Sequence, residues 1–320
     1  MSVEARTQPS FTPETTFRSY NKDQGQNYAQ NRRQYHPKFY QILLNHHAAT
    51  GGQFDSVLDI GCGPGTAIRS LALSFNHAVG LDPSEGMITT ARSLGGAASS
   101  GEPIRFEVST AEILGSNLSP SIANCSVDLI TAAVAAHWFD MDIFWARAAE
   151  ILKPGGSVAI WVSSSMKVHP GMPNSVAVQA AIDKHVDMLS EYLVHGNLLA
   201  HDLYVNLPLP WTLSTPVPEF DESTFLRKEW GTSDNSEPED EFYAGAQAVN
   251  LDQMEGLLST ASPITRWREA HPEAVGTEND LVRLLRREIE RALYEAGVEK
   301  GKELVRGGVK GVLLMVKKKA

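Results

Sequence analysis

Short apolar runs separated by polar or glycine-rich turns give residues 56–162 a regular pattern. The continuous hydrophobic character of each run is typical of a strand buried on both faces of a parallel sheet. Strands are expected at Val57–Ile60, Ala78–Leu81, Ile104–Val108, Val127–Ala133 and Ser157–Val162. Helices are expected at Thr66–Phe75, after a Ser84 cap, and at Phe144–Leu152. This alternation predicts a doubly wound, mostly parallel α/β sheet.

Beyond residue 162 the pattern changes. Helical stretches are expected at Val176–Leu193, Phe242–Leu258 and Asp280–Ala296. Phe225–Trp230 is a possible strand within this region, and the β-rich run Val309–Lys318 is expected beside Glu303–Arg306 as the closing part of a seven-stranded sheet. Long insertions on a rigid scaffold usually carry specificity, so residues 163–298 are expected to form a helical cap over a pocket. Trp211, Trp230, Tyr243, Arg266, Trp267 and Arg268 are its candidate lining groups.

The ends of the chain complete the expected division. Residues 1–16 are polar and contain two prolines, which predicts a disordered tail. In residues 17–50 aromatic and basic side chains interleave, and we expect a helical lid. The alternative for this segment is a helix that packs its aromatic residues on the domain. Residues 51–162 are the expected core, and residues 299–320 a closing β-hairpin of its sheet.

A glycine-rich loop follows the first strand. Asp59 lies near the carboxyl end of that strand, and Gly61-Cys62-Gly63-Pro64-Gly65 comes next. Such a loop lets the backbone turn sharply and approach a ligand closely. Asp82, 19 residues beyond Gly63, ends the second strand, where a carboxylate can accept both hydroxyls of a ribose. The unit therefore predicts a Rossmann-like site for a nucleoside-bearing cofactor.

The glycine spacing helps to separate two cofactor classes. The dinucleotide fingerprint is G-x-G-x-x-G, whereas this loop reads G-x-G-x-G. Asp59 directly before the loop suits a cationic ligand better than a pyrophosphate, because a carboxylate repels phosphate. An NAD-dependent enzyme stays as the alternative from the other cofactor class, and a tight turn without any ligand is the structural alternative.

The run D-I-G-C-G-P-G-T, Asp59 to Thr66, resembles the first motif of class I S-adenosylmethionine (SAM)-dependent methyltransferases. The resemblance implies that the acid and glycines hold the methionine part, that Asp82 takes the ribose, and that the loop carrying Glu112 meets the adenine. The L-K-P-G-G run at residues 152–156 is a further feature of that family. The cofactor-binding residues expected for SAM are Tyr28, Arg32, Asp59, Gly61, Cys62, Gly63, Asp82, Pro83, Met87, Thr110, Ala111, Glu112 and Ala133.

Outer segments resemble a narrower group, that of trans-aconitate methyltransferase. They are Tyr28 with the run Arg32–Tyr35, the run Ala136–Asp140 and the run Trp267–Pro272. The resemblance implies methylation of a small molecule, at a carboxylate or hydroxyl oxygen of an organic acid or secondary metabolite. The region after residue 163 departs from the pattern of an aconitate enzyme, which leaves the substrate open.

His137 is the titratable group nearest the tip of the fourth strand. Its ordinary pKa lies near neutrality, which suits a proton acceptor, and we expect it to be catalytic. The alternative is a packed, hydrogen-bonded histidine. A hydroxyl acceptor would need this base, whereas a carboxylate would need only orienting groups such as arginines. The substrate-binding residues expected are Arg33, Tyr35, His137 and Trp138.

Net charge, cysteine count and the length of the apolar stretches limit the partners and the cellular setting that we expect. The formal charge of −10 argues against a nucleic-acid partner. The two cysteines, Cys62 and Cys125, lack metal-ligand spacing, which predicts no metal and a reducing, cytoplasmic setting. No apolar stretch reaches the length that spans a bilayer. The expected oligomeric state is a monomer or a homodimer. The alternative functions are an enzyme with the methyltransferase fold that catalyses another reaction, and a regulatory protein that binds SAM.

Overall fold

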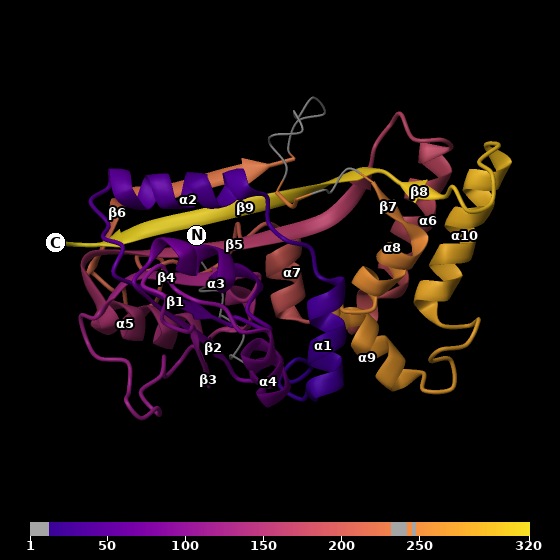
Figure 1. Cartoon of the computed structure of the whole chain (residues 1–320). Helices are drawn as coiled ribbons and strands as arrows, with labels where there is room; N and C mark the ends of the chain where they lie inside the picture. Colours follow the sequence, from indigo (N-terminus) through magenta and orange to yellow (C-terminus); the bar gives the residue numbers. More distant parts are fainter. Residues whose placement is uncertain (1–12, 232–241, 245–247) are drawn as a thin grey trace, which may run out of the picture.

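The structure is a computed structural model that describes residues 13–231, 242–244 and 248–320. Its centre is a seven-stranded sheet in the order β3-β2-β1-β4-β5-β9-β6 (Figure 1). The expected disordered tail lies outside the described residues up to residue 12. No helix in the described ranges is long and apolar enough to cross a membrane.

Five parallel strands form the first part of the sheet. They are β1 (Ser56–Ile60), β2 (His77–Asp82), β3 (Arg105–Val108), β4 (Val127–Ala133) and β5 (Leu152–Val168). The helices between them are α3 (Thr66–Leu71) with the 3₁₀ turn η1 (Ala72–Ser74), α4 (Glu85–Leu94) and α5 (Met141–Ile151). Ser84 caps α4 through the N–H of Met87, as expected. The predicted α/β architecture of a mostly parallel sheet is confirmed.

Hydrophobic cores cover both faces of the sheet because successive strand residues point to opposite sides. On one face Leu58, Ile130 and Ile160 pack with Phe144 and Trp145 of α5. On the other face the core contains Leu129 and Trp161 and the buried residues of α2 (Pro37–Ala49). Continuous burial on both faces therefore explains why these strands read as unbroken apolar runs.

The expected closing hairpin at residues 299–320 is wrong. β8 (Leu304–Val305) pairs with β7 (Val249–Asn250), and β9 (Gly307–Lys318) lies antiparallel between β5 and β6 (Phe220–Trp230). Gly311 to Lys317 are all buried, so this strand needs a neighbour on each side. The predicted strand at Phe225–Trp230 is confirmed as part of β6, although it belongs to the main sheet and not to a cap.

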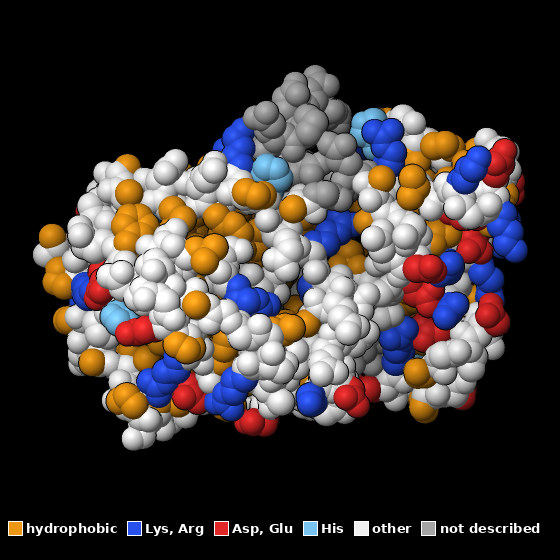
Figure 2. Space-filling model, viewed as in Figure 1, with side chains coloured by type: hydrophobic (Ala, Val, Ile, Leu, Met, Phe, Trp, Pro, Cys, Tyr) orange, Lys and Arg blue, Asp and Glu red, His pale blue; other side chains and the backbone are white. Residues whose placement is uncertain are grey.

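A second lobe is built mainly from helices. Its helical elements are α6 (Ser175–Met188), η3 (Ser190–Tyr192), α8 (Leu251–Leu258), α9 (Ser262–Ala270) and α10 (Leu281–Glu295), whereas α7 (His195–His201) packs against β5 and the core of the main sheet. Clusters around Leu285 with Ile289 and around Ile264 with Trp267 give it cores of its own. β5 continues to Val168, past the expected boundary at residue 162, and β5 and β9 run from the main sheet to this lobe (Figure 1). Figure 2 shows acidic and basic side chains gathered over the lobe.

The two helices of the N-terminal segment pack in different parts of the molecule. α1 (Lys22–Asn31) packs against α4 and α8, whereas α2 lies along β9 and β6 (Figure 1). In α2 Phe39 and Leu43 are fully buried. Only the part before residue 37 therefore has the position expected of a lid. Thr16 is buried as well, so the expected tail does not extend to residue 16.

Candidate active site

Two neighbouring cavities open at the carboxyl ends of the parallel strands, where open α/β sheets bind ligands. The smaller has a volume of about 90 Å³ and the larger about 260 Å³. Both are lined by the same five residues, which form what we call the shared wall: Tyr28, Gly61, Gly63, Ala133 and Val134. Val134 has a φ of +54°, a strained conformation for a β-branched residue that turns the chain away at the tip of β4.

The glycine loop shapes the shared wall through its backbone. Gly61 and Gly63 have φ values of +63° and +55°, which favour glycine. A Cβ atom on Gly61 would lie 2.5 Å from the Cβ of Ala135. A Cβ atom on Gly63 would meet nothing within 4 Å, because this residue borders both cavities. The loop thus leaves open space where a ligand can approach the backbone.

Asp82 lines the smaller cavity at the tip of β2. Its Oδ2 accepts the N–H of Gly63 at 2.9 Å, and its Oδ1 accepts the N–H of Ser84 at 2.9 Å. Burial raises the pKa of this carboxyl to about 6. Each oxygen keeps a further lone pair, so Asp82 can accept hydrogen bonds from a pair of ligand hydroxyls.

Asp59 differs from the expectation. It is fully buried and lines neither cavity, because the glycine loop lies between it and the open space. Its Oδ1 accepts the hydroxyl of Thr131 at 2.6 Å, while its Oδ2 has no hydrogen-bond partner. Burial raises the pKa of Asp59 to about 7. Asp59 therefore supports the loop from behind.

The rest of the smaller cavity contains most of the expected cofactor residues. Pro83, Met87, Thr110, Ala111 and Glu112 all line it. Glu112 accepts the N–H of Asp140 at 3.2 Å, which ties the loop after β3 to the N-terminus of α5. Trp138, expected on the substrate side, lines this cavity instead.

The lining residues of the smaller cavity that were not among the expected site residues include Glu14, Phe17 and Arg18. The segment 13–21, which we call the strap, covers the cavity. Glu14 accepts the N–H groups of Thr16 and Phe17. The ring of Phe17 makes edge contacts with Tyr28 and Trp138. Phe17 and Arg18 belong to the segment 17–50 that is expected to form a lid, whereas residues 13–16 belong to the expected disordered tail.

The larger cavity receives Arg32, Arg33, Tyr35 and Cys62. Arg32 and Cys62, expected to contact the cofactor, line only this cavity. Among the described residues that line this cavity, the two arginines are the charged ones. The Arg32 guanidinium lies 4.6 Å from the centre of the Tyr28 ring and donates to the carbonyl of Thr260 at 2.9 Å. The Arg32 Nε is buried without a partner, which is the state expected of a group that binds an anion.

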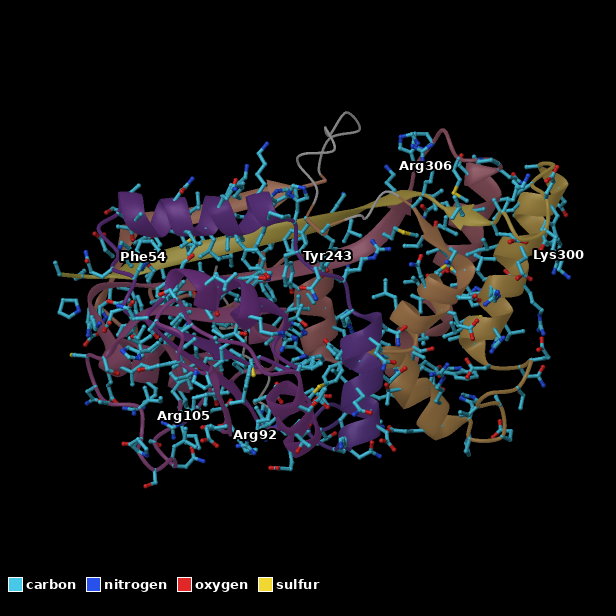
Figure 3. The ribbon with its side chains drawn as sticks, viewed as in Figure 1. Phe54, Arg92, Arg105, Tyr243, Lys300 and Arg306 are labelled. Atoms are coloured by element: carbon cyan, nitrogen blue, oxygen red, sulfur yellow. The ribbon has the colours of Figure 1, made fainter. Side chains whose placement is uncertain are left out.

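A β-bulge supplies residues that the sequence did not indicate. The pairing of β5 with β9 shifts between Ser163 and Met166, and bulges of this kind redirect side chains near sites. Ser163 and Ser164 both line the larger cavity. Ser163 Oγ lies 2.8 Å from the hydroxyl of Tyr243, which Figure 3 shows at the middle of the molecule. Further unpredicted lining residues are Pro64, Thr66, Ala67, Met166, Leu257, Leu258, Ala261 and Val309.

Of the candidate lining groups in the insertion, Tyr243 alone borders a described cavity. Trp211, Trp230 and Trp267 pack in hydrophobic clusters. Arg266 bonds to Thr16 and Asn197, and Arg268 forms an ion pair with Asp280. In the described part of the chain, no group of three or more His, Cys, Asp or Glu side chains could hold a metal ion.

His137 does not occupy the position expected of a catalytic base. It lines neither cavity, and its Nδ1 lies 2.7 Å from the hydroxyl of Tyr204. Burial, with Arg32 as a second cause, lowers the pKa of His137 to about 3. A histidine of this pKa is neutral but only a weak base near pH 7. Its surroundings match the alternative of a packed, hydrogen-bonded residue.

The smaller cavity fits SAM by its own features: open space at Gly63 and a buried carboxylate with free lone pairs at Asp82. The comparisons agree. Residues 58–160 match the family model of the methyltransferase domain. A methyltransferase of Dictyostelium discoideum is 31% identical over 47% of this chain and 50% of its own length. A methyltransferase of Aspergillus candidus is 26% identical over 80% of this chain and 83% of its own.

Solved structures share the fold. A type II methyltransferase structure from Anaeromyxobacter dehalogenans has a TM-score of 0.56 at 22% identity, covering 90% of this chain and 97% of that chain. A yeast protein of Saccharomyces cerevisiae, named as S-adenosylmethionine-dependent, is 25% identical over 69% of this chain and 74% of its own. Residues 58–160 therefore form the domain of a SAM-dependent methyltransferase, with SAM as its cofactor. The matched segment spans half of the Dictyostelium protein's length.

Proposed function

We propose that the protein transfers the methyl group of SAM to an oxygen of a small molecule, most simply a carboxylate of an organic acid or secondary metabolite. The observation that carries the proposal is the shared wall. It separates the cavity with the methyltransferase motif from a cavity that contains two arginines and no described carboxylate. The resemblance to the trans-aconitate methyltransferase group also supports an acidic acceptor.

Each cavity has a set of residues suited to its task. In the smaller one, Asp82 would accept the ribose hydroxyls, Met87 and Ala111 would contact the adenine, and Gly63 would admit the chain of the cofactor. In the larger one, Arg32 and Arg33 would orient the acceptor's carboxylate.

The reaction needs no proton acceptor. When bound, SAM supplies a methyl group on a positively charged sulfur; the carboxylate oxygen forms the new C–O bond while the C–S bond breaks with its electron pair going to sulfur. The work of the chain is to orient the two molecules and to exclude water. No histidine, aspartate or glutamate is among the described residues of the larger cavity, which agrees with a carboxylate and disfavours a phenol or alcohol.

The size of the acceptor cavity, about 260 Å³, and the charge of −10 support a small-molecule partner over a nucleic acid. A monomer suffices for the proposed reaction, since every group assigned to it belongs to one chain. A homodimer stays a prediction from the sequence.

The test is methyl transfer by the purified protein with SAM and a panel of acids, phenols and alcohols. We expect S-adenosylhomocysteine and a methyl ester in equal amounts with at least one acid. Arg32→Met should raise the KM for that acid about tenfold while the affinity for S-adenosylhomocysteine stays unchanged. Product formation from phenols alone, or SAM binding without any transfer, would contradict the proposal.

A further inference from the structure

We infer that the acceptor is a monocarboxylic acid with an apolar body, and not a small polycarboxylic acid. This inference rests on the proposed function, because it identifies the substrate class of the larger cavity. It is carried by the distribution of charged, polar and apolar groups around that cavity.

The positive charge of the cavity comes from one short segment. Arg32 and Arg33 are adjacent and both line the cavity between α1 and α2. The guanidinium of Arg32 lies over the ring of Tyr28, which belongs to the shared wall. An acceptor carboxylate bound by Arg32 is thereby held next to the smaller cavity, where the methyl group must come from.

Three hydroxyl groups of the cavity, those of Ser163, Ser164 and Tyr243, already have partners. Ser164 donates to the carbonyl of His201 at 3.0 Å. Ser163 and Tyr243 share one hydrogen bond, so only one of their two protons is left for a ligand. Together with the arginines, this hydroxyl can satisfy one carboxylate at the Arg32 end of the cavity.

The remaining lining is largely apolar. Met166 and Val309 are paired across β5 and β9, and Leu257, Leu258 and Ala261 come from the end of α8 and the turn after it. All five are partly exposed, so a ligand can contact them. A second carboxylate lying against these side chains would lose hydration without gaining a partner, which costs several kcal/mol. A hydrocarbon body in the same place would gain about 25 cal/mol for each Å² it buries.

The decisive comparison uses two acids of equal length, octanoate and octanedioate, which differ only in the second carboxylate. Each is titrated calorimetrically into the full-length protein saturated with S-adenosylhomocysteine. We expect octanoate to bind at least about tenfold more tightly. Equal or tighter binding of octanedioate, or no saturable binding of octanoate at millimolar concentration, overturns the inference.

A variant with an added charge sharpens the test. Val309→Lys places an ammonium group in the apolar part of the cavity and should lower the preference for octanoate about tenfold. Val309→Met, which keeps the residue apolar, is the matched control and should retain the preference. An unchanged preference in a folded Val309→Lys protein would show that the body of the acid does not lie there, which overturns the assignment.

The two proposals can fail separately. Binding is measured with S-adenosylhomocysteine, so it does not depend on turnover. Tight, selective binding of octanoate without formation of methyl octanoate from SAM would refute the proposed function and leave the ligand class standing. Methyl transfer to octanedioate in preference to octanoate would refute the assigned ligand class and leave the proposed function standing.

Discussion

Asp82 holds its carboxylate in the smaller cavity by two backbone hydrogen bonds, and burial raises its pKa to about 6. As the pH falls through about 6, a proton takes up a lone pair that a ligand hydroxyl would use. The affinity for S-adenosylhomocysteine should therefore fall below pH 6 and be constant above pH 7. Asp82→Asn should weaken binding at pH 8 about tenfold and remove the pH step, as measured by calorimetry.

Asp59 provides the matched control for this experiment. Its pKa is also raised, to about 7, but it lines neither cavity. Asp59→Asn should keep the step near pH 6. If the fall in affinity for S-adenosylhomocysteine near pH 6 disappears with Asp59→Asn and persists with Asp82→Asn, then Asp59 and not Asp82 is the carboxylate that binds the ligand.

The histidine at the tip of β4 gives a second prediction at this scale. His137→Ala removes a hydrogen bond to Tyr204 and part of a packed contact, so it should cost about 1–2 kcal/mol of the free energy of unfolding. Because His137 lines neither cavity, kcat on an acid should change less than about threefold. A loss of activity beyond a hundredfold at unchanged cofactor affinity would restore His137 as a catalytic residue.

Among single residues, the sequence predicts the cofactor side far better than the acceptor side. Asp82, Met87 and Glu112 belong to a local pattern of strand ends, and all three line the smaller cavity. Ser163 and Tyr243 are brought together by the fold from positions 80 residues apart. No local spacing signals such a contact.

At the scale of elements, the loop between β1 and α3 offers a pair of substitutions with opposite effects. Gly63→Ala adds a methyl group in open space, with a strain of roughly 1–2 kcal/mol from its positive φ. It should lower the affinity for S-adenosylhomocysteine more than about tenfold and leave a folded protein. Gly61→Ala drives a Cβ into Ala135 and should chiefly lower the melting temperature. Calorimetry and thermal unfolding of both variants would check this; equal cofactor affinities would place the ligand away from Gly63.

The strap is held down by a residue of the second lobe. Arg266 of α9 donates to Thr16 at 3.0 Å and to the carbonyl of Tyr192 at 2.8 Å. Arg266→Ala should release the strap, speed amide exchange in residues 13–21, and weaken cofactor binding several-fold. Arg268→Ala, which breaks an ion pair within the lobe, is the control and should leave exchange in the strap unchanged. Equal exchange in both variants would mean that the strap holds its place without Arg266.

The sequence predicted the ends of a strand correctly where nearly all residues of the strand are buried. Val127–Ala133 matches β4 at both ends, since six of its seven residues are buried. The expected end of β5 at residue 162 was too early because Ser163 and Ser164 interrupt the apolar run at the bulge. Polar residues facing a cavity read as a strand end when only the sequence is considered.

At the scale of the whole molecule, the two cavities meet at five shared residues, so their occupants should influence each other. We expect an acid to bind several-fold more tightly when S-adenosylhomocysteine fills the smaller cavity and fixes Tyr28 beneath Arg32. Linkage requires the acid to tighten the binding of S-adenosylhomocysteine by the same factor. Two calorimetric titrations, each with and without the other ligand, measure both factors; identical affinities in all four would show independent sites.

The general architecture could be predicted because strand–helix alternation leaves few topologies. Which residues each lobe contributes to the larger cavity could not be predicted from the sequence. The larger cavity takes residues from Tyr28 to Val309, on both sides of the insertion. Which of these distant segments meet depends on how far β5 and β9 extend beyond the sheet, and a local pattern does not contain that information.

The position of β9 in the sheet also affects how the chain folds. β6 precedes β9 in the sequence by nearly eighty residues, yet β9 is the only strand that it pairs with in the described sheet. During synthesis from the N-terminus, β5 and β6 must therefore wait with unpaired edges until β9 emerges and inserts between them. Exposed edges of this kind are where other chains can pair, so this stage carries the greatest risk of aggregation. The slow, long-range closure by β9 is expected to set the rate of folding.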